Sequence, residues 1–456
     1  MITSLWQISD RWSSHLPGRI SDGSADLSLT ALLEQTRFGG QLERLRGQSI
    51  LLVPSNQLDA ISALVELDGV ARRMIICPPD ATKEFLIAAA DIGAADIVIG
   101  RGDHADGYAS PLQQYELLKP ERINRKVERS QATEWVLPTS GTSGPPKLVV
   151  HTIATLCGAF PRQGADLERL DWATFYDIRR FGGLQILLRT LVGGGNLLLA
   201  AEQPTGQFLS RAGELGVTHI SGTPSHWRRA LMTGELQKIA PRYVRLSGEV
   251  ADQAVLDSLA GTFPSATIAH AFASTEVGVT FEVGDGVSGF PADLVGRTGS
   301  DVELEVMDGS LHVRSNRTAL RYLGGDKPLK DDRGFIDTGD LVELRIGRYQ
   351  FLGRRNGVIN VGGLKVHPEE VEAIINRHPA VQLSRVTAKR NPITGAIVVA
   401  QILARTGDNS IDLHAVESEV VTICRRALPP HKVPVKIEFV QSLEMGASGK
   451  LVRNHV

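Results

Sequence analysis

Residues 135–150 read Trp135-Val136-Leu137-Pro138-Thr139-Ser140-Gly141-Thr142-Ser143-Gly144-Pro145-Pro146-Lys147-Leu148-Val149-Val150. The apolar runs at the two ends predict strands, and the loop between them places hydroxyl and backbone N–H donors around a concavity that suits a polyphosphate. Lys147 adds positive charge. The loop is not a Walker loop, because no glycine precedes Lys147 and Leu148 stands where Ser or Thr would bind magnesium. We interpret it as a phosphate-binding loop, because flexible linkers rarely carry a lysine between two strands.

Short apolar runs alternate with helical patterns on both sides of this loop. Strands are expected at Ile50–Val53, Met74–Ile76, Ile97–Ile99, Leu197–Leu199, Val217–Ile220, Tyr243–Leu246 and Thr267–Phe272. Helices are expected from Asn56 to Leu67, at Thr82–Asp91 and Phe208–Leu215, and from near Ser225. Such alternation predicts an α/β fold with right-handed crossovers and mostly parallel sheets. We expect two α/β units, at about residues 1–135 and 136–295.

The pattern changes after Gly296. Val302–Val306 alternates strictly and is followed by the turn residues Asp308-Gly309, which predicts a hairpin, and a second hairpin is expected about Gly347. These strands suggest a β-subdomain at about residues 296–353. Beyond it, a helix from Pro368, strands at Leu383–Ala388 and Ile397–Ala404, a helix at Leu413–Arg426 and a strand at Val435–Val440 predict a small α+β domain over 354–456, beside a large domain over 1–353.

Composition excludes several classes of protein. The chain has 456 residues with 49 Lys+Arg against 51 Asp+Glu, which argues against a general nucleic-acid binder. The three cysteines are far apart, so neither a disulfide framework nor a CxxC metal site is available. The most apolar stretch, Leu184–Leu199, is interrupted by Arg189 and does not reach the roughly 18 residues of a membrane helix. The first residues do not resemble a signal peptide. We expect a cytoplasmic protein with no membrane span and no nucleic-acid partner.

Five segments together resemble the motifs of the adenylate-forming superfamily, which includes acyl-CoA synthetases, adenylation domains and luciferases. Besides the loop, they are Ala271-Phe272-Ala273-Ser274-Thr275-Glu276, Asp337-Thr338-Gly339-Asp340, the stretch from Gly353 to Glu372, and Ser448-Gly449-Lys450. Their order and spacing follow the family over roughly residues 136–450, whereas the first 135 residues carry no such motif. The resemblance implies a large adenylating domain and a small mobile C-terminal domain that presents a catalytic lysine.

The resemblance assigns most of these residues to ATP. Thr275 is implied to touch phosphate, and Glu276 to hold the magnesium ion, a hard cation that carboxylates suit. Both follow a predicted strand at its carboxyl end, where open parallel sheets bind ligands. Asp340 is implied to accept the ribose hydroxyls and Arg354 to pair with ribose or phosphate. The other implied nucleotide-binding residues are Thr139, Ser140, Gly141, Thr142, Ser143, Gly144, Lys147, Gly248, Glu249, Phe272, Ala273 and Ser274.

Phe272 stands where the family often has tyrosine, so stacking on adenine is expected without the hydroxyl. Lys450 is implied to neutralise the attacking carboxylate and the α-phosphate, which is electrostatic stabilisation together with positioning. Asn356 stands at the family's hinge position, and the glycine that follows it also suits a hinge. Gly362 and Gly363 are implied to line the path of a pantetheine thiol.

The segment from Phe175 to Leu184 matches the family's acid pocket. Arg179 or Arg180 falls near the usual histidine, and Phe181 falls near the aspartate with which amino-acid activators bind the α-ammonium group. This favours a non-amino carboxylic acid. An arginine that faces the pocket could bind a second carboxylate or a polar ring substituent, and the alternative is an outward-facing salt bridge.

Three functions are compatible with these residues. The first is an AMP-forming acid–CoA ligase that uses ATP, Mg²⁺ and coenzyme A. The second is a stand-alone enzyme that loads an acyl group onto a carrier-protein phosphopantetheine. The third is a non-catalytic nucleotide-binding regulator, which should have lost Lys450, Glu276 or the phosphate loop. All three are present, so we favour the ligase, with a small carboxylic acid as substrate and a homodimer as a candidate assembly.

Overall fold

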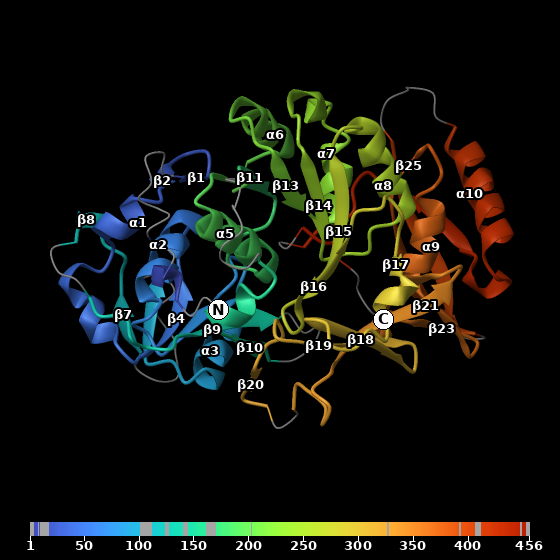
Figure 1. Ribbon diagram of the computed structural model, residues 1–456. Helices are drawn as coiled ribbons and strands as arrows, with labels where there is room; N and C mark the ends of the chain where they lie inside the picture. Colours follow the sequence, from blue (N-terminus) through green and yellow to red (C-terminus); the bar gives the residue numbers. More distant parts are fainter. Residues whose placement is uncertain are drawn as a thin grey trace.

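Two large sheets form the N-terminal body of the protein in a computed structural model (Figure 1). The structure describes residues 4–7, 9, 18–100, 112–123, 127–139, 145–160, 170–201, 203–325, 328–391, 394–405, 412–446 and 449–452. Among these residues, no helix is both long and apolar enough to cross a membrane. The α/β fold class expected from the sequence is confirmed.

The eight-stranded sheet is parallel except at its two edges. Its order is β16-β15-β14-β13-β11-β12-β1-β2. Within this order, the strands from β15 across to β1 run parallel to one another. The edge strands β16 and β2 each pair antiparallel with their neighbour. The bounds are β1 Arg19–Ser21, β2 Asp26–Ser28, β11 Trp172–Thr174, β12 Leu197–Leu199, β13 His219–Gly222, β14 Tyr243–Ser247, β15 Thr267–Ser274 and β16 Gly278–Val283. The carboxyl ends of β13, β14 and β15 therefore meet at one edge, where such sheets bind ligands.

The seven-stranded sheet contains the phosphate-loop hairpin. Its order is β20-β10-β9-β5-β4-β6-β7. The bounds are β4 Ser49–Val53, β5 Arg73–Ile76, β6 Ile97–Gly100, β7 Gln113–Tyr115, β9 Glu134–Thr139, β10 Lys147–His151 and β20 Arg321–Leu323. Strands β9 and β10 pair antiparallel with Thr139 opposite Lys147, because the connection between them is too short for a crossover. A separate pair joins β3 (Gln35–Thr36) to β8 (Glu121–Arg122).

Several helices of the body begin where the sequence places capping residues. Asn56, Thr82, Thr223 and Asp252 each accept a backbone N–H of the first turn, which stabilises a helix start. The helices are α1 Ala31–Glu34, α2 Gln57–Leu67, α3 Lys83–Ile92, α4 Ile153–Leu156, α5 Phe181–Gly193, α6 Thr205–Glu214, α7 Pro224–Ala230 and α8 Gln253–Thr262. Helix α5 has no counterpart in our sequence prediction. Its buried residues lie on nearly all sides, so it lacks the amphipathic period that marks a surface helix.

The two sheets do not follow the division that we expected at residue 135. Strands β1 and β2, from the N-terminal part of the chain, extend the eight-stranded sheet, whereas β9, β10 and β20 belong to the seven-stranded sheet. One continuous apolar core contains Ile20 and Leu197 of the first sheet and Ile50 and Trp135 of the second. The two α/β units thus form one body.

A five-stranded sheet and the C-terminal domain complete the molecule. The sheet has the order β17-β22-β21-β19-β18, with β17 Phe290–Pro291, β18 Val302–Met307, β19 Ser310–Ser315, β21 Ile336–Arg345 and β22 Arg348–Arg354. The C-terminal domain contains β23 Ile359–Val361, β24 Leu364–Val366, α9 Pro368–Ile375, β25 Val381–Asn391, β26 Gly395–Ala404, α10 Leu413–Ala427 and β27 Lys436–Phe439. Its apolar core draws only on residues from Ile359 to Phe439, so it is built as a separate unit. Figure 1 shows it, in orange and red, beside α7 and α8.

Candidate active site

The Lys450 side chain lies at the carboxyl end of β14. A Cβ added to Gly248, the residue after this strand, would lie 3.2 Å from Cε and 3.7 Å from Nζ of Lys450. Gly248 has a φ of +88°, so a side chain there would be strained as well as crowded. The glycine thus lets the lysine approach the ligand-binding edge of the sheet.

Two main-chain hydrogen bonds hold the Lys450 loop against the body. The hydroxyl of Thr223 donates to the carbonyl of Gly449 at 2.9 Å. The backbone N–H of Leu451 donates to Glu249 Oε1 at 2.9 Å, and the second oxygen of Glu249 accepts the N–H of Ser225 at 3.0 Å. Glu249, which the resemblance assigns to the nucleotide, here joins the start of α7 to the lysine loop.

Four charged groups act on the Lys450 ammonium. Part of this side chain stays open to solvent, but protein surrounds most of it, and this desolvation is the main cause that lowers its pKa. The carboxylates of Glu249 and Asp340 oppose the shift, and the charges of Arg354 and Arg180 add to it. The candidate ribose residues Asp340 and Arg354 and the candidate pocket residue Arg180 thus all act electrostatically on Lys450.

Asp340 and Arg354 come from neighbouring strands of the five-stranded sheet. They are paired in register, and Arg354 Nε donates to Asp340 Oδ1 at 3.1 Å. Burial raises the pKa of the Asp340 carboxyl, while Arg354 and Lys450 lower it and Glu276 raises it. The structure thus brings together Asp340, Arg354, Glu276 and Lys450, which are far apart in the sequence.

The Thr275-Glu276 pair is held from both sides. His151 Nε2 lies 2.6 Å from the carbonyl oxygen of Thr275, and Nδ1 lies 2.9 Å from the hydroxyl of Thr155. A carbonyl only accepts, so Nε2 carries the hydrogen, and complete burial lowers the pKa of His151 to about 4, which keeps the ring neutral. The hydroxyl of Tyr322 donates to Glu276 Oε1 at 3.4 Å.

Lys147 lies close to this pair. Its Nζ is 5.7 Å from the centre of the Tyr322 ring, across the pairing of β10 with β20. Thr139 lies opposite Lys147 at the other end of the phosphate loop. The loop residues Ser140, Gly141, Thr142, Ser143 and Gly144 lie outside the described residues. The Lys147 end of the loop thus lies beside the strand that carries Tyr322.

Phe272 packs in an aromatic cluster. Its ring stacks on Phe281 at 5.5 Å and on Phe351 at 5.2 Å between ring centres. Ala273 follows at a bulge in the pairing of β15 with β16, and Ser274 accepts the N–H of Val277 at 3.3 Å. These contacts assign Phe272 to packing, and its stacking on adenine stays a prediction.

The two candidate pocket arginines have different environments. Arg179 is 8% exposed and donates to both oxygens of Asp177, at 2.9 and 2.7 Å, and to the carbonyl of Pro54 at 3.0 Å. The expectation that Arg179 could face the pocket is therefore corrected, because its donors are used inside the fold. Arg180 forms an ion pair with Asp80, and its charge acts on Lys450. Of the two arginines, Arg180 is thus the one whose charge acts on the candidate catalytic lysine.

Two aromatic residues, Tyr176 and Phe181, lie close to Arg180 in the sequence. The Phe181 ring lies 6.0 Å from the ring of His151. The Tyr176 hydroxyl donates to the Ser247 carbonyl at 2.6 Å, and a Cβ on Gly182 would contact its ring at 3.4 Å. Our sequence analysis did not single out Tyr176, His151, Thr223 or Tyr322. Only Thr223 carries a local signal, as a capping residue before Pro224.

The segment assigned to hinge and thiol lies in the C-terminal domain. Asn356 belongs to a short helical turn, Arg355–Gly357, directly after β22. Gly362 and Gly363 form the turn between β23 and β24, with φ values of +59° and +86°. Among the described residues, none has an atom within 4 Å of a Cβ placed on Gly363. In this arrangement Lys450, rather than the glycine turn, occupies the end of β14.

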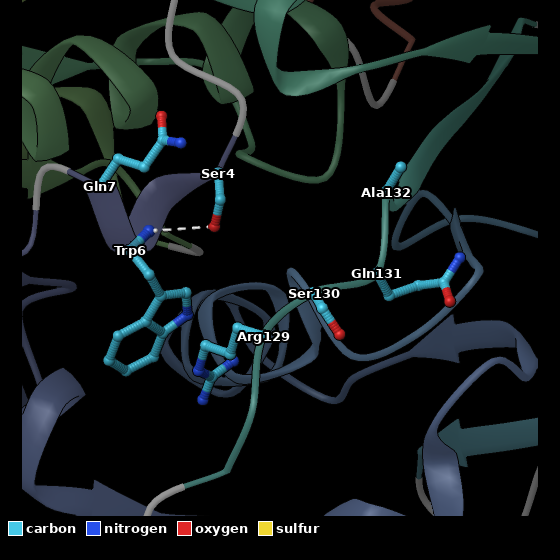
Figure 2. A pocket seen from close by; sticks show the side chains of 7 residues that line it. All are labelled: Ser4, Trp6, Gln7, Arg129, Ser130, Gln131 and Ala132. Atoms are coloured by element: carbon cyan, nitrogen blue, oxygen red, sulfur yellow. Dashed lines mark hydrogen bonds between the residues drawn. The ribbon is translucent and has the colours of Figure 1, made fainter.

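A cavity of about 350 Å³ lies apart from these residues, between the N-terminal segment and the non-helical, non-strand segment that leads to β9 (Figure 2). The Arg129 guanidinium stacks on the Trp6 indole, 3.7 Å from the ring centre. Its Nη1 also donates to the carbonyls of Glu66 and Asp68, at 2.6 and 2.9 Å. These contacts of Arg129 fasten the N-terminal segment to the body.

Two profiles of known families match the chain. The profile of the AMP-binding enzyme family matches residues 60–319, and the profile of the AMP-binding enzyme C-terminal domain matches residues 370–450. The chain belongs to the AMP-binding enzyme family. The recognition of the adenylate-forming superfamily from the sequence is thereby confirmed.

Several relatives of this AMP-binding enzyme are CoA ligases. A 2-succinylbenzoate–CoA ligase of Salmonella typhimurium is 28% identical over 59% of this chain and 58% of its own length. An acyl-coenzyme A synthetase, ACSM4 of Mus musculus, is 27% identical over 77% of this chain and 65% of its own. These matches thus span less than two thirds of the relatives' lengths. The fold matches the anthranilate CoA ligase AuaEII, solved with anthranoyl-AMP, with a TM-score of 0.81, 17% identity, and coverage of 98% and 95% of the two chains.

Proposed function

We propose that this AMP-binding enzyme activates a carboxylic acid with ATP as an acyl-adenylate and transfers the acyl group to coenzyme A. The observation that carries the proposal is the position of Lys450 beside Gly248, next to Asp340 and Arg354. In the first half-reaction a carboxylate oxygen of the acid attacks the α-phosphorus of ATP. The bond between this phosphorus and the oxygen that bridges to the β-phosphate breaks, and pyrophosphate leaves. In the second, the thiol attacks the acyl carbon and AMP leaves.

Lys450 supplies the charge that the first half-reaction needs. Attack brings a carboxylate onto a phosphate that is already negative, and an ammonium group at this point stabilises the charge without reorganisation. The carboxylate of Asp340 accepts hydrogen bonds from the ribose hydroxyls when ATP is bound, and Arg354 orients this carboxylate. His151 holds the backbone carbonyl of Thr275, and Tyr322 holds the carboxylate of Glu276. These residues thus mainly position the substrates and neutralise their negative charge.

Glu276 suits a magnesium ion bound to nucleotide. Mg²⁺ in nucleotide sites is usually held by one or two carboxylates together with phosphates, not by a complete set of protein ligands. Within the described residues no group of three or more potential ligands occurs, which agrees with that arrangement. When bound, the ion screens the negative charge of ATP. Glu276 would hold it.

The acid is proposed to be a non-amino acid with a polar or anionic substituent. Asp177 is engaged by Arg179 and so is occupied rather than offered to an α-ammonium group. Arg180 supplies a cation near Lys450. The name of one relative carries 2-succinylbenzoate, an aromatic acid with a second carboxylate and no amino group. Transfer to a carrier-protein phosphopantetheine is the alternative, and a cytoplasmic location and a homodimer remain predictions.

A pyrophosphate-release screen tests the proposal. The purified protein is given ATP, magnesium and a panel of aliphatic and aromatic carboxylic acids, first without thiol and then with coenzyme A or carrier protein. We expect pyrophosphate and AMP with at least one acid, and thioester once coenzyme A is added. ADP with phosphate as products would contradict the proposal, and thioester on carrier protein alone would select the alternative.

Arg180→Leu should change acid selectivity, whereas Arg179→Leu should mainly destabilise the fold. Loss of a charge-assisted contact to the substrate costs about 1.5–3 kcal/mol, so we expect a KM for the best acid raised roughly tenfold or more. Arg179→Leu leaves the partly buried Asp177 carboxylate without its arginine and should lower the melting temperature. The checks are KM over the acid panel and thermal unfolding. An unchanged selectivity profile in Arg180→Leu would place this arginine outside the pocket.

A further inference from the structure

A carboxylate of the body receives a hydrogen bond from the C-terminal domain. Asp252 caps α8, and its Oδ1 accepts the N–H of Val255 at 3.0 Å. Arg228, on α7, donates through Nη2 to both oxygens of Asp252, at 2.6 and 2.5 Å. Asn376, at the end of α9, donates through Nδ2 to Oδ2 of Asp252 at 3.1 Å. Asp252 thus connects the two domains.

The contact is buried and its orientation follows from chemistry. A carboxylate accepts hydrogen bonds, so the amide nitrogen of Asn376 faces Asp252. The amide oxygen of Asn376 accepts the hydroxyl of Ser384 at 2.9 Å. Asn376 is 7% exposed and Arg228 8%. Arg228 Nη1 also reaches the carbonyl of Gln382, on β25, at 3.4 Å.

The hydrogen bond between Asn376 and Asp252 can form and break without leaving a buried charge unpaired. Asp252 and Arg228 both belong to the body, so they stay paired if the C-terminal domain moves away. Asn376 keeps Ser384 and exchanges one hydrogen bond for water. A buried charge that loses its partner is strongly destabilising, but neither arrangement here requires that. The pairing therefore suits an interface that opens in each catalytic cycle.

The same short segment also holds the catalytic lysine. Gly248 contacts Lys450, Glu249 binds the N–H of Leu451, and Asp252 binds Asn376. Residues 248–252 therefore contact two parts of the C-terminal domain at once. The hydrogen bond of Asn376 and the placement of Lys450 belong to one domain arrangement.

We propose that Asn376 is a positioning residue for acyl-adenylate formation. Its hydrogen bond to Asp252 holds the C-terminal domain in the arrangement that places Lys450 at Gly248. It does not contribute to thioester formation, for which the domain must leave this position. The inference rests on the proposed function, in which the two half-reactions use different domain arrangements.

The test measures both half-reactions in Asn376→Ala and Asn376→Asp. The first is followed by pyrophosphate release with the best acid of the panel, and the second by thioester formed from synthetic acyl-adenylate and coenzyme A. A hydrogen bond to a charged group is worth roughly tenfold to a hundredfold in an equilibrium constant. We expect the first rate to fall about tenfold in Asn376→Ala, and further in Asn376→Asp because two carboxylates then face each other. The second rate should be unchanged or higher.

Ser418→Asp is the matched control. Ser418 is exposed on α10, so this change adds the same charge to the same domain away from the interface, and both rates should stay as in the wild type. Equal losses in both half-reactions, or an unchanged first rate in both Asn376 variants, would overturn the proposal. If Asn376→Asp does not fold, Asn376→Ala still decides. Failure of the proposed function would appear separately, as no pyrophosphate release by the wild-type protein.

Discussion

Lys450→Ala should suppress acyl-adenylate formation by orders of magnitude and leave thioester formation nearly intact. Its ammonium group is preorganised at the end of β14, beside Asp340 and Arg354. Removing one preorganised donor from developing charge costs on the order of 10²–10³-fold in rate in comparable sites. The loss should appear in kcat of the first half-reaction, because the charge matters most where carboxylate and phosphate meet.

The two half-reactions again separate the alternatives. Thioester formation from synthetic acyl-adenylate does not require the lysine, so its rate should stay close to that of the wild type. Lys436→Ala is a suitable control, because this lysine is exposed on β27 of the same domain. Equal losses in both half-reactions of Lys450→Ala would contradict the two-arrangement mechanism and leave the residue with a general binding role.

Gly449→Ala should reduce acyl-adenylate formation almost as strongly, although it keeps the lysine. A Cβ at Gly449 would lie 1.9 Å from Cε1 and 2.0 Å from Nε2 of His226. The His226 ring cannot easily yield, because it stacks on Phe175 at 5.2 Å and its Nδ1 accepts the N–H of Thr223 at 3.1 Å. The lysine loop must therefore undock. Pyrophosphate release and thioester formation measured separately should show the same pattern as in Lys450→Ala.

Gly216→Ala controls for backbone strain in this experiment. Gly449 has a φ of +70° and Gly216 a φ of +62°, but no atom of the described part of the chain lies within 4 Å of a Cβ placed on Gly216. A left-handed conformation costs a residue other than glycine about 1–2 kcal/mol, so both variants should lose a similar amount of stability. Only Gly449→Ala should lose the first half-reaction. Normal adenylation by Gly449→Ala would show that the loop binds differently during the reaction.

Much of the fold could be predicted because its signals are local. The helix at Gln57–Leu67 begins after a capping asparagine, and the hairpin of β18 and β19 turns at Asp308-Gly309, as expected from the sequence. Helix α5 could not be predicted, because a helix buried on most sides shows no period. The sequence also did not predict which strands belong to which sheet, because strand pairing depends on packing contacts across the whole chain.

The sequence by itself determined the family, the α/β class and the residues that bear charge at the site. Motifs such as Ser448-Gly449-Lys450 carry that information in neighbouring positions. Only the tertiary structure decided how these charges are used. It paired Arg179 with Asp177 and brought Arg180 toward Lys450. It also joined Thr223 to Gly449 across 226 residues and Asn376 to Asp252 across 124. Contacts at such separations leave no periodic or local pattern, because they depend on which faces of distant elements pack together.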